Sequence, residues 1–80
     1  MTEQRTSPRR HTFKVGTILF GWATAVECVV RNLSATGACI EVASSAGIPG
    51  EFALRIKREI PKRECRVAWR SKRRIGVRFK

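Results

Sequence analysis

The chain has 80 residues, of which 17 are basic and 6 are acidic, so its net charge is +11. Eighty residues make one small domain with a single core, which leaves little room for a catalytic cleft. Hydrophobic residues form 42% of the chain, a share typical of folded globular domains, so global disorder is not expected despite the charge.

Neither a membrane span nor an exported protein is expected. No apolar run approaches the roughly 18 residues that a spanning helix needs. The first residues lack the apolar segment of a signal peptide, so we expect a cytoplasmic protein. The three cysteines are widely spaced and form no CxxC pair, and His11 stands alone, which predicts neither a zinc site nor a disulfide.

The N-terminal residues 1–13 are polar and basic and show no periodicity, which predicts a flexible arm. Pro8 disfavours a helix before it and favours an extended backbone. The folded domain is then expected to occupy residues 14–80.

Six candidate strands follow the arm. They span residues 14–20, 25–31, 37–42, 51–57 and 62–70, and a last strand ends at Phe79. Apolar and polar residues alternate in them, and helical periodicity is absent. This pattern predicts an all-β fold, a small six-stranded antiparallel β-barrel, because closure leaves no long exposed edge.

The same alternation predicts which side chains enter the core. Cys28 and Cys65 share the parity of their apolar neighbours and are expected inside, whereas Cys39 is expected to face solvent. Trp69 has the parity of core positions in its strand. Trp22 lies in a turn and is expected to be its partly buried anchor.

The turn between the second and third strands carries the pattern Asn32-x-Ser34-x-x-Gly37. Asn and Ser side chains can hold a turn by bonding to the local backbone, and Gly allows a positive φ or a close backbone approach. These residues alone are those of an ordinary hairpin loop.

A second feature, the Arg5-x-x-x-Arg9 pattern in the arm, precedes this turn. The two patterns in this order resemble the PilZ domain, a family that binds the bacterial second messenger cyclic di-GMP. The resemblance extends to residues 47–49, to the Arg-Val-x-Trp segment at 66–69 and to residues 75–79. It implies a six-stranded β-barrel that the arm wraps, often around an intercalated pair of ligand molecules.

The resemblance also implies a set of ligand-binding residues. They are Arg5, Arg9, Arg10, Asn32, Ser34 and Gly37. An arginine can bond the guanine O6/N7 edge, pair with phosphate and stack on a base. The chain departs from the family pattern at Thr6, where many members carry another arginine. It also departs at Asn32, which replaces the commoner aspartate and gives up a charge-assisted bond.

These features together predict a sensor or adaptor rather than an enzyme. The sequence offers no acid–base pair with a cleft, no nucleophile–histidine arrangement and no metal ligand set. Cyclic di-GMP would order the arm, and an unidentified protein partner in trans would detect the change. No cofactor other than this ligand is expected, and the protein would be a monomer or a ligand-dependent dimer.

Two alternatives remain open. Residues 55–80 carry twelve basic and two acidic side chains, a net charge of +10, which would suit a barrel that binds RNA or single-stranded DNA. The expected inward placement of Phe52, Trp69 and Phe79 argues against nucleic acid, because such modules expose their aromatic residues. The other alternative is a PilZ-fold adaptor that has lost its ligand.

Overall fold

The computed structural model describes residues 10–57 and 62–80, and for residues 10–12 it describes the backbone alone. This part of the chain contains six strands and no helix, so no helix in it is long and apolar enough to cross a membrane. The strands are β1 (Arg10–Phe20), β2 (Thr24–Leu33), β3 (Gly37–Glu41), β4 (Glu51–Ile56), β5 (Arg63–Arg70) and β6 (Arg74–Phe79).

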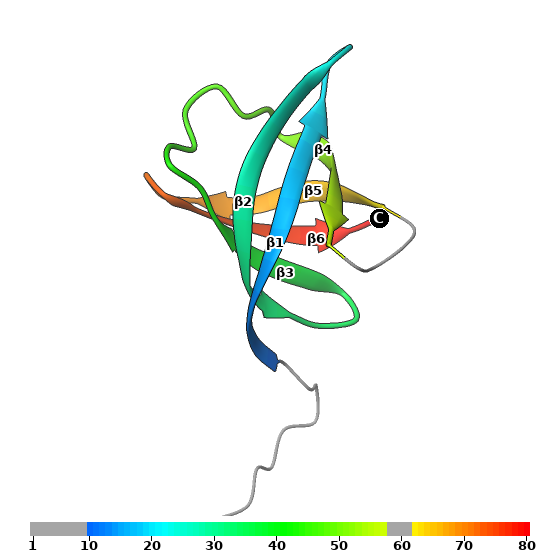
Figure 1. The fold of residues 1–80 in the computed structure, drawn as a ribbon, viewed down its shortest axis with the longest axis vertical. Helices are drawn as coiled ribbons and strands as arrows, with labels where there is room; N and C mark the ends of the chain where they lie inside the picture. The colour runs from blue at the N-terminus through cyan, green and yellow to red at the C-terminus, as the bar shows by residue number, and fades with distance from the viewer. Residues whose placement is uncertain (1–9, 58–61) are drawn as a thin grey trace, which may run out of the picture.

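The strands form a closed barrel in the order β1-β2-β3-β6-β5-β4, and every neighbouring pair is antiparallel. The expected six-stranded antiparallel β-barrel is therefore confirmed. Figure 1 shows that the β2–β3 turn and the start of β1 lie at one end of the barrel, and that the β1–β2 turn lies at the other.

The first two strands are longer than the sequence predicts. β1 begins at Arg10 rather than at Lys14, because Arg10 pairs with Leu33 and His11 pairs with Asn32. β2 continues to Leu33, past the polar Asn32 that looks like the beginning of a loop. This extension brings the start of β1 directly beside the β2–β3 turn.

Alternating side chains of the six strands fill the barrel. The largest fully buried ones are Ile18, Val30, Ile40, Leu54, Cys65 and Ile75. Cys28 and Cys65 are buried, as the alternation predicts. Burial raises the pKa of the Cys28 thiol to about 12 and that of the Cys65 thiol to about 11, so both stay protonated and unreactive at neutral pH.

The loop between β3 and β4 is fastened to the turn between β5 and β6. The Ser45 hydroxyl donates to the carbonyl oxygen of Ser71 (2.5 Å), and its backbone N–H donates to that of Lys72 (2.9 Å). Arg70 in turn donates from its guanidinium to the carbonyl oxygen of Ser45 (2.9 Å). These bonds hold the tip of the β5–β6 hairpin in a defined position.

Trp22, expected to be a partly buried anchor, is instead 93% exposed, so that prediction is wrong. The pairing of β1 with β4 runs from Gly16 to Leu19 and so ends before the β1–β2 turn. Gly21 has a φ of 60°, which only glycine adopts at low cost and which makes the turn tight.

Replacing Leu54 with alanine tests the account of the core. Leu54 is 0% exposed, so Leu54→Ala should lower the free energy of unfolding by about 2–5 kcal/mol through lost burial and a residual cavity. Urea denaturation followed by circular dichroism measures this change. Arg55→Ala, at the exposed neighbouring position, is the control and should change stability by no more than about 0.5 kcal/mol. Equal losses in both variants would contradict the assigned faces.

Candidate functional site

Four strands each contribute one residue to a row that crosses the outer face of the barrel. In the register of the sheet Asn32 lies opposite Cys39, Cys39 lies opposite Gly76, and Gly76 lies opposite Trp69. The row therefore runs from β2 through β3 and β6 to β5, with an amide at one end and an indole at the other.

Trp69 faces outward because the register of β5 shifts by one residue between Val67 and Trp69. Such a β-bulge adds a residue to one strand and reverses the side to which the following side chains point. The indole is 49% exposed, so the expectation that Trp69 belongs to the core is wrong. It covers Gly76, since a Cβ built on that glycine would overlap the indole ring.

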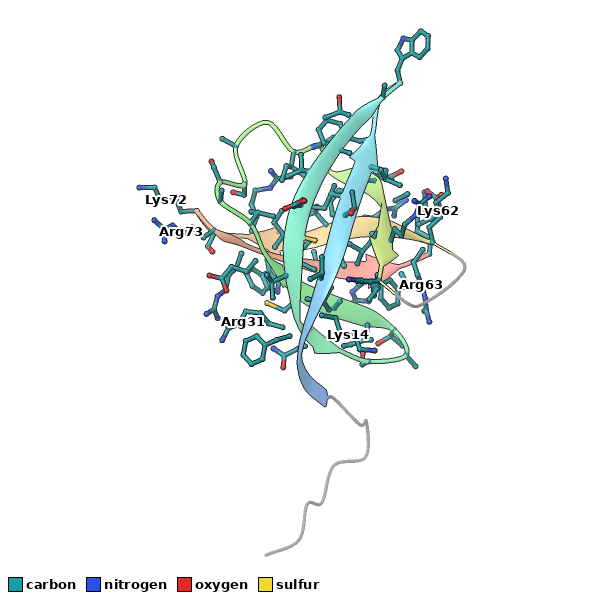
Figure 2. All side chains as sticks on the ribbon, viewed as in Figure 1. Lys14, Arg31, Lys62, Arg63, Lys72 and Arg73 are labelled. Carbon is teal, nitrogen blue, oxygen red and sulfur yellow. The ribbon has the colours of Figure 1, made fainter. Side chains whose placement is uncertain are left out.

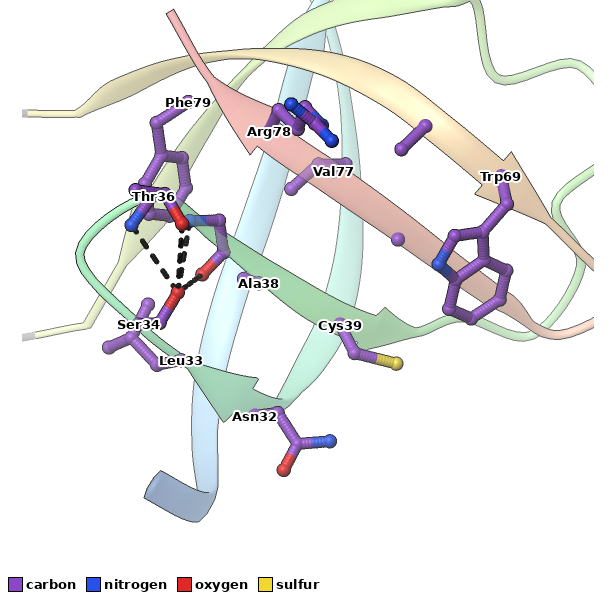
Figure 3. A pocket seen from close by; sticks show the side chains of 13 residues that line it. Asn32, Leu33, Ser34, Thr36, Ala38, Cys39, Trp69, Val77, Arg78 and Phe79 are labelled. Carbon is purple, nitrogen blue, oxygen red and sulfur yellow. Dashed lines mark hydrogen bonds between the residues drawn. The ribbon is translucent and has the colours of Figure 1, made fainter. Parts of the chain in front are cut away.

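A cavity of about 620 Å³ lies along this row. Its volume is within the range of small-molecule sites, about 300–1,000 Å³. The lining residues are Asn32, Leu33, Ser34, Thr36, Gly37, Ala38, Cys39, Ala68, Trp69, Gly76, Val77, Arg78 and Phe79. Figure 3 shows a low floor, with Cys39 on β3 between the amide of Asn32 and the indole of Trp69. Cys39 is half-buried there rather than fully solvent-facing.

A second row lies two residues further along the strands. Gly37 is opposite Arg78, Arg78 is opposite Arg66, and Arg66 is opposite Glu51. Lys80 donates a hydrogen bond to the Glu51 carboxylate (3.0 Å), and Arg66 donates another (3.1 Å). These contacts hold the pKa of the Glu51 carboxyl below its ordinary value. Within the described residues no carboxylate pairs with Arg78, which stands exposed at the rim of the cavity.

The β2–β3 turn is held by its own side chains. The Ser34 hydroxyl accepts hydrogen bonds from the backbone N–H groups of Thr36 (3.3 Å) and Gly37 (3.2 Å), and the Ser34 N–H donates to the Gly37 carbonyl oxygen (2.9 Å). Gly37 is required by a close approach rather than by a positive φ, since a Cβ there would overlap the carbonyl oxygen of Val77. The hydroxyl of Ser34 thus serves the turn in this structure.

Asn32 carries a buried polar atom without a partner. Its Oδ1 is buried and makes no hydrogen bond with any of the described residues. Figure 3 shows its Nδ2 on the side of Cys39 and Trp69. The neighbouring Arg31 is occupied elsewhere, because it pairs with Glu41 (2.8 Å) and its guanidinium carbon lies 4.9 Å from the centroid of the Phe13 ring.

The structure brings three of the predicted site residues, Asn32, Ser34 and Gly37, to the edge of one cavity. The backbone of Arg10 lies opposite Leu33, next to this edge, and Arg5 and Arg9 lie outside the described residues. Sequence reasoning missed Trp69 and did not include the cavity residue Arg78. The available signal was Gly76, a glycine in the middle of a strand, which often marks the close approach of another group.

A closed barrel with a cavity on its outer face, beside the start of its first strand, has the architecture of a small binding domain. The chain belongs to the PilZ domain family, whose model matches residues 3–80, essentially the whole chain. PilZ domains are binding and adaptor domains, and cyclic di-GMP is the ligand for which the family is known. Comparison with curated proteins finds no match. In residues 10–57 and 62–80 no cluster of His, Cys, Asp or Glu side chains is arranged to hold a metal ion.

Replacing Gly76 with alanine tests the contact between this glycine and Trp69. The added methyl group would occupy the space of the indole, so Gly76→Ala should displace the ring and expose it further. In a Trp22→Phe background, which leaves Trp69 as the only indole, the emission should shift to longer wavelength and acrylamide quenching should increase. Gly50→Ala is the control, because nothing lies within 4 Å of a Cβ at that position. Unchanged emission in Gly76→Ala would contradict the described contact.

Proposed function

We propose that this PilZ domain is a cyclic di-GMP sensor and adaptor. The ligand binds on the outer face of β3 and β6, between Asn32 and Trp69. The observation that supports this proposal most strongly is the row of four residues, which places a low floor of Cys39 and Gly76 between a hydrogen-bonding amide and an exposed indole.

The dimensions of the row suit a dinucleotide. Neighbouring strands lie about 4.8 Å apart, so the two ends of the row, three strands apart, are separated by about 14 Å. The second row lies two residues along the strand, about 7 Å away. A guanine stacked on Trp69 leaves the other half of the ligand within range of Asn32, with Arg78 beside the phosphates.

The amide of Asn32 matches the hydrogen-bonding edge of guanine. Its unpartnered Oδ1 requires a donor, since buried polar atoms are almost always hydrogen-bonded. Guanine N–H groups or an arm guanidinium can supply that donor, and Nδ2 can donate to O6 or N7. An amide forms weaker bonds to these N–H groups than a carboxylate would, so we expect a lower affinity than an aspartate at this position would give.

Trp69 and Arg78 supply the two other interactions that the ligand needs. Stacking of a base on an aromatic ring contributes about 1–3 kcal/mol. Arg78 is exposed at the rim and has no carboxylate partner among the described residues. Its guanidinium can therefore pair with a phosphate of the ligand without first breaking an ion pair with one of these residues.

The arm would complete the site. β1 begins at Arg10, beside the β2–β3 turn, so Arg9 follows directly from the edge of the cavity. Five residues span at most about 18 Å, which keeps Arg5 within range of the same ligand. A ligand that binds both arm and barrel favours the docked arm over the free one, and a protein partner in trans can detect that difference. The stoichiometry of binding distinguishes one bound ligand molecule from an intercalated pair.

Calorimetric titration with cyclic di-GMP tests this function, with GTP and cyclic di-AMP as specificity controls. We expect binding in the micromolar range or tighter, about −8 kcal/mol or more favourable. Trp69→Ala, Asn32→Ala and Arg9→Ala should each weaken it by about tenfold or more, because each removes about 1.4 kcal/mol of contacts. Arg73→Ala, outside the cavity lining, should bind normally. The absence of heat and of a thermal shift would leave a PilZ-fold adaptor that has lost its ligand.

Alkylation of Cys39 gives a second readout of the same prediction. Cys28 and Cys65 are buried and their pKa values are raised, whereas Cys39 is half-exposed in the cavity. Iodoacetamide should therefore modify Cys39 first in the native protein, and cyclic di-GMP should slow that modification. Mass spectrometry of the peptides identifies the site. Modification at an unchanged rate with saturating ligand would place the ligand away from this cavity.

A further inference from the structure

The β5–β6 hairpin presents a row of basic side chains that extends beyond the proposed dinucleotide site. We define the basic hairpin face as the exposed outer side chains Arg66, Trp69, Lys72, Arg73 and Arg78. Lys72 and Arg73 project from the tip of the hairpin in Figure 2, and Lys62 and Arg63 project at its opposite end. The face extends over several residues of two paired strands, so it is long rather than compact.

Most of the positive charge of this face has no carboxylate partner in the described part of the barrel, the exception being Arg66, which pairs with Glu51. Among the described residues no carboxylate pairs with Lys72, Arg73 or Arg78. Arg66 and Arg78 lie directly opposite each other in the register, an arrangement that destabilises a sheet unless an anion lies near both. Glu51, the carboxylate that pairs with Arg66, also binds Lys80. This excess charge favours an extended anionic partner.

Trp69 indicates which kind of anion fits. Its indole is 49% exposed and lies along the hairpin between the basic tip and the Arg66–Arg78 pair. Cationic grooves with exposed aromatic rings are typical of surfaces that bind single-stranded nucleic acid, because bases stack on the rings while phosphates meet the cations. A run of acidic side chains would pair with the cations but offers no base to stack on the ring. The sequence argued against nucleic acid because Trp69 was expected to point into the core. Its exposed position removes that objection for Trp69.

The tip of the hairpin is held in place before any partner binds. The Ser71 N–H donates to the Arg74 carbonyl oxygen (2.8 Å), and Ser45 bonds to the carbonyl oxygens of Ser71 and Lys72. Because the backbone is fixed, only side chains must be ordered on binding, which lowers the entropic cost. Six to eight extended residues span about 20–26 Å, enough for several nucleotides of a single strand.

We propose that the basic hairpin face binds single-stranded nucleic acid, with phosphates at Lys72, Arg73 and Arg78 and a base stacked on Trp69. This inference goes beyond the proposed dinucleotide function and does not depend on it. Its contacts at the hairpin tip, Lys72 and Arg73, lie outside the lining of the cavity.

Fluorescence anisotropy with fluorescein-labelled oligouridine and oligothymidine tests the proposal on the full chain. Each phosphate contact in a single strand contributes about −0.7 to the slope of log K against log salt, so three contacts predict a slope of about −2. The double variant Lys72→Glu/Arg73→Glu should weaken binding by about tenfold or more and reduce that slope by about 1.4. Trp69→Ala should weaken binding by about tenfold, and Trp69→Phe should largely retain it.

The matched control is Arg55→Glu/Lys57→Glu, which changes the net charge equally on a different face. Arg55 lies opposite Thr17 of β1, and the Lys57 N–H donates to the Val15 carbonyl oxygen (2.8 Å), so both are beside β1 rather than on the hairpin. This control should bind more tightly than the hairpin variant. Equal losses in the two double variants would overturn the proposal, because they would show binding by net charge alone.

Two other results would also overturn it. One is wild-type affinity in Trp69→Ala together with displacement of the oligonucleotide by polyglutamate, which would assign the face to an acidic protein. The other is the absence of oligonucleotide binding at low salt. The proposed dinucleotide function is judged separately, since Lys72→Glu/Arg73→Glu should retain cyclic di-GMP binding. If the wild-type protein fails to bind one of the two ligands, cyclic di-GMP or the oligonucleotide, the result for the other ligand still stands.

Discussion

The contact between the indole of Trp69 and the backbone of Gly76 is the constraint on which the outer face of this barrel depends. A side chain at residue 76 would occupy the space of the ring, and without the bulge in β5 the ring would point inward. With both conditions met, a large aromatic surface lies on a flat part of the sheet, next to the small Cys39. The cavity exists because two adjacent strands carry almost no side-chain volume at its floor.

Barrel closure then decides what surrounds that floor. The β2–β3 turn is stabilised by the Ser34 hydroxyl and packs closely on β6 at Gly37. The start of β1 pairs with the end of β2, so Arg10 lies beside the same turn. One antiparallel register thus brings together a turn, an indole and the first residues of β1, to which the basic N-terminal segment is joined. These parts are far apart in the sequence, and strand pairing alone brings them together.

Much of this architecture could be predicted from the sequence, and the exceptions depend on features that local alternation does not report. Alternation identified the six strands and the buried Cys28 and Cys65, because each side chain reports its own face locally. It failed at Trp69, since a bulge changes the parity without leaving a sequence signal of its own. The expectation that Trp22 anchors its turn was also wrong, because nothing in the local sequence shows whether a turn side chain is covered. The sequence identified the motif residues Asn32, Ser34 and Gly37, and the structure places them at one edge of the cavity. The position of Arg78 at the cavity was not predictable, because it depends on the register between β3, β5 and β6.

The central claim is that cyclic di-GMP binds against Trp69, and the two tryptophans allow a direct measurement. Trp69 lies in the cavity, and Trp22 lies at the β1–β2 turn at the other end of the barrel, 93% exposed. Each gives one indole Nε1–H signal in a ¹H–¹⁵N NMR spectrum. On titration with cyclic di-GMP the account predicts a large shift of the Trp69 signal, with shifts of the Asn32 and Gly37 amides, and an unchanged Trp22 signal. A bound ligand that leaves the Trp69 signal in place would contradict the account.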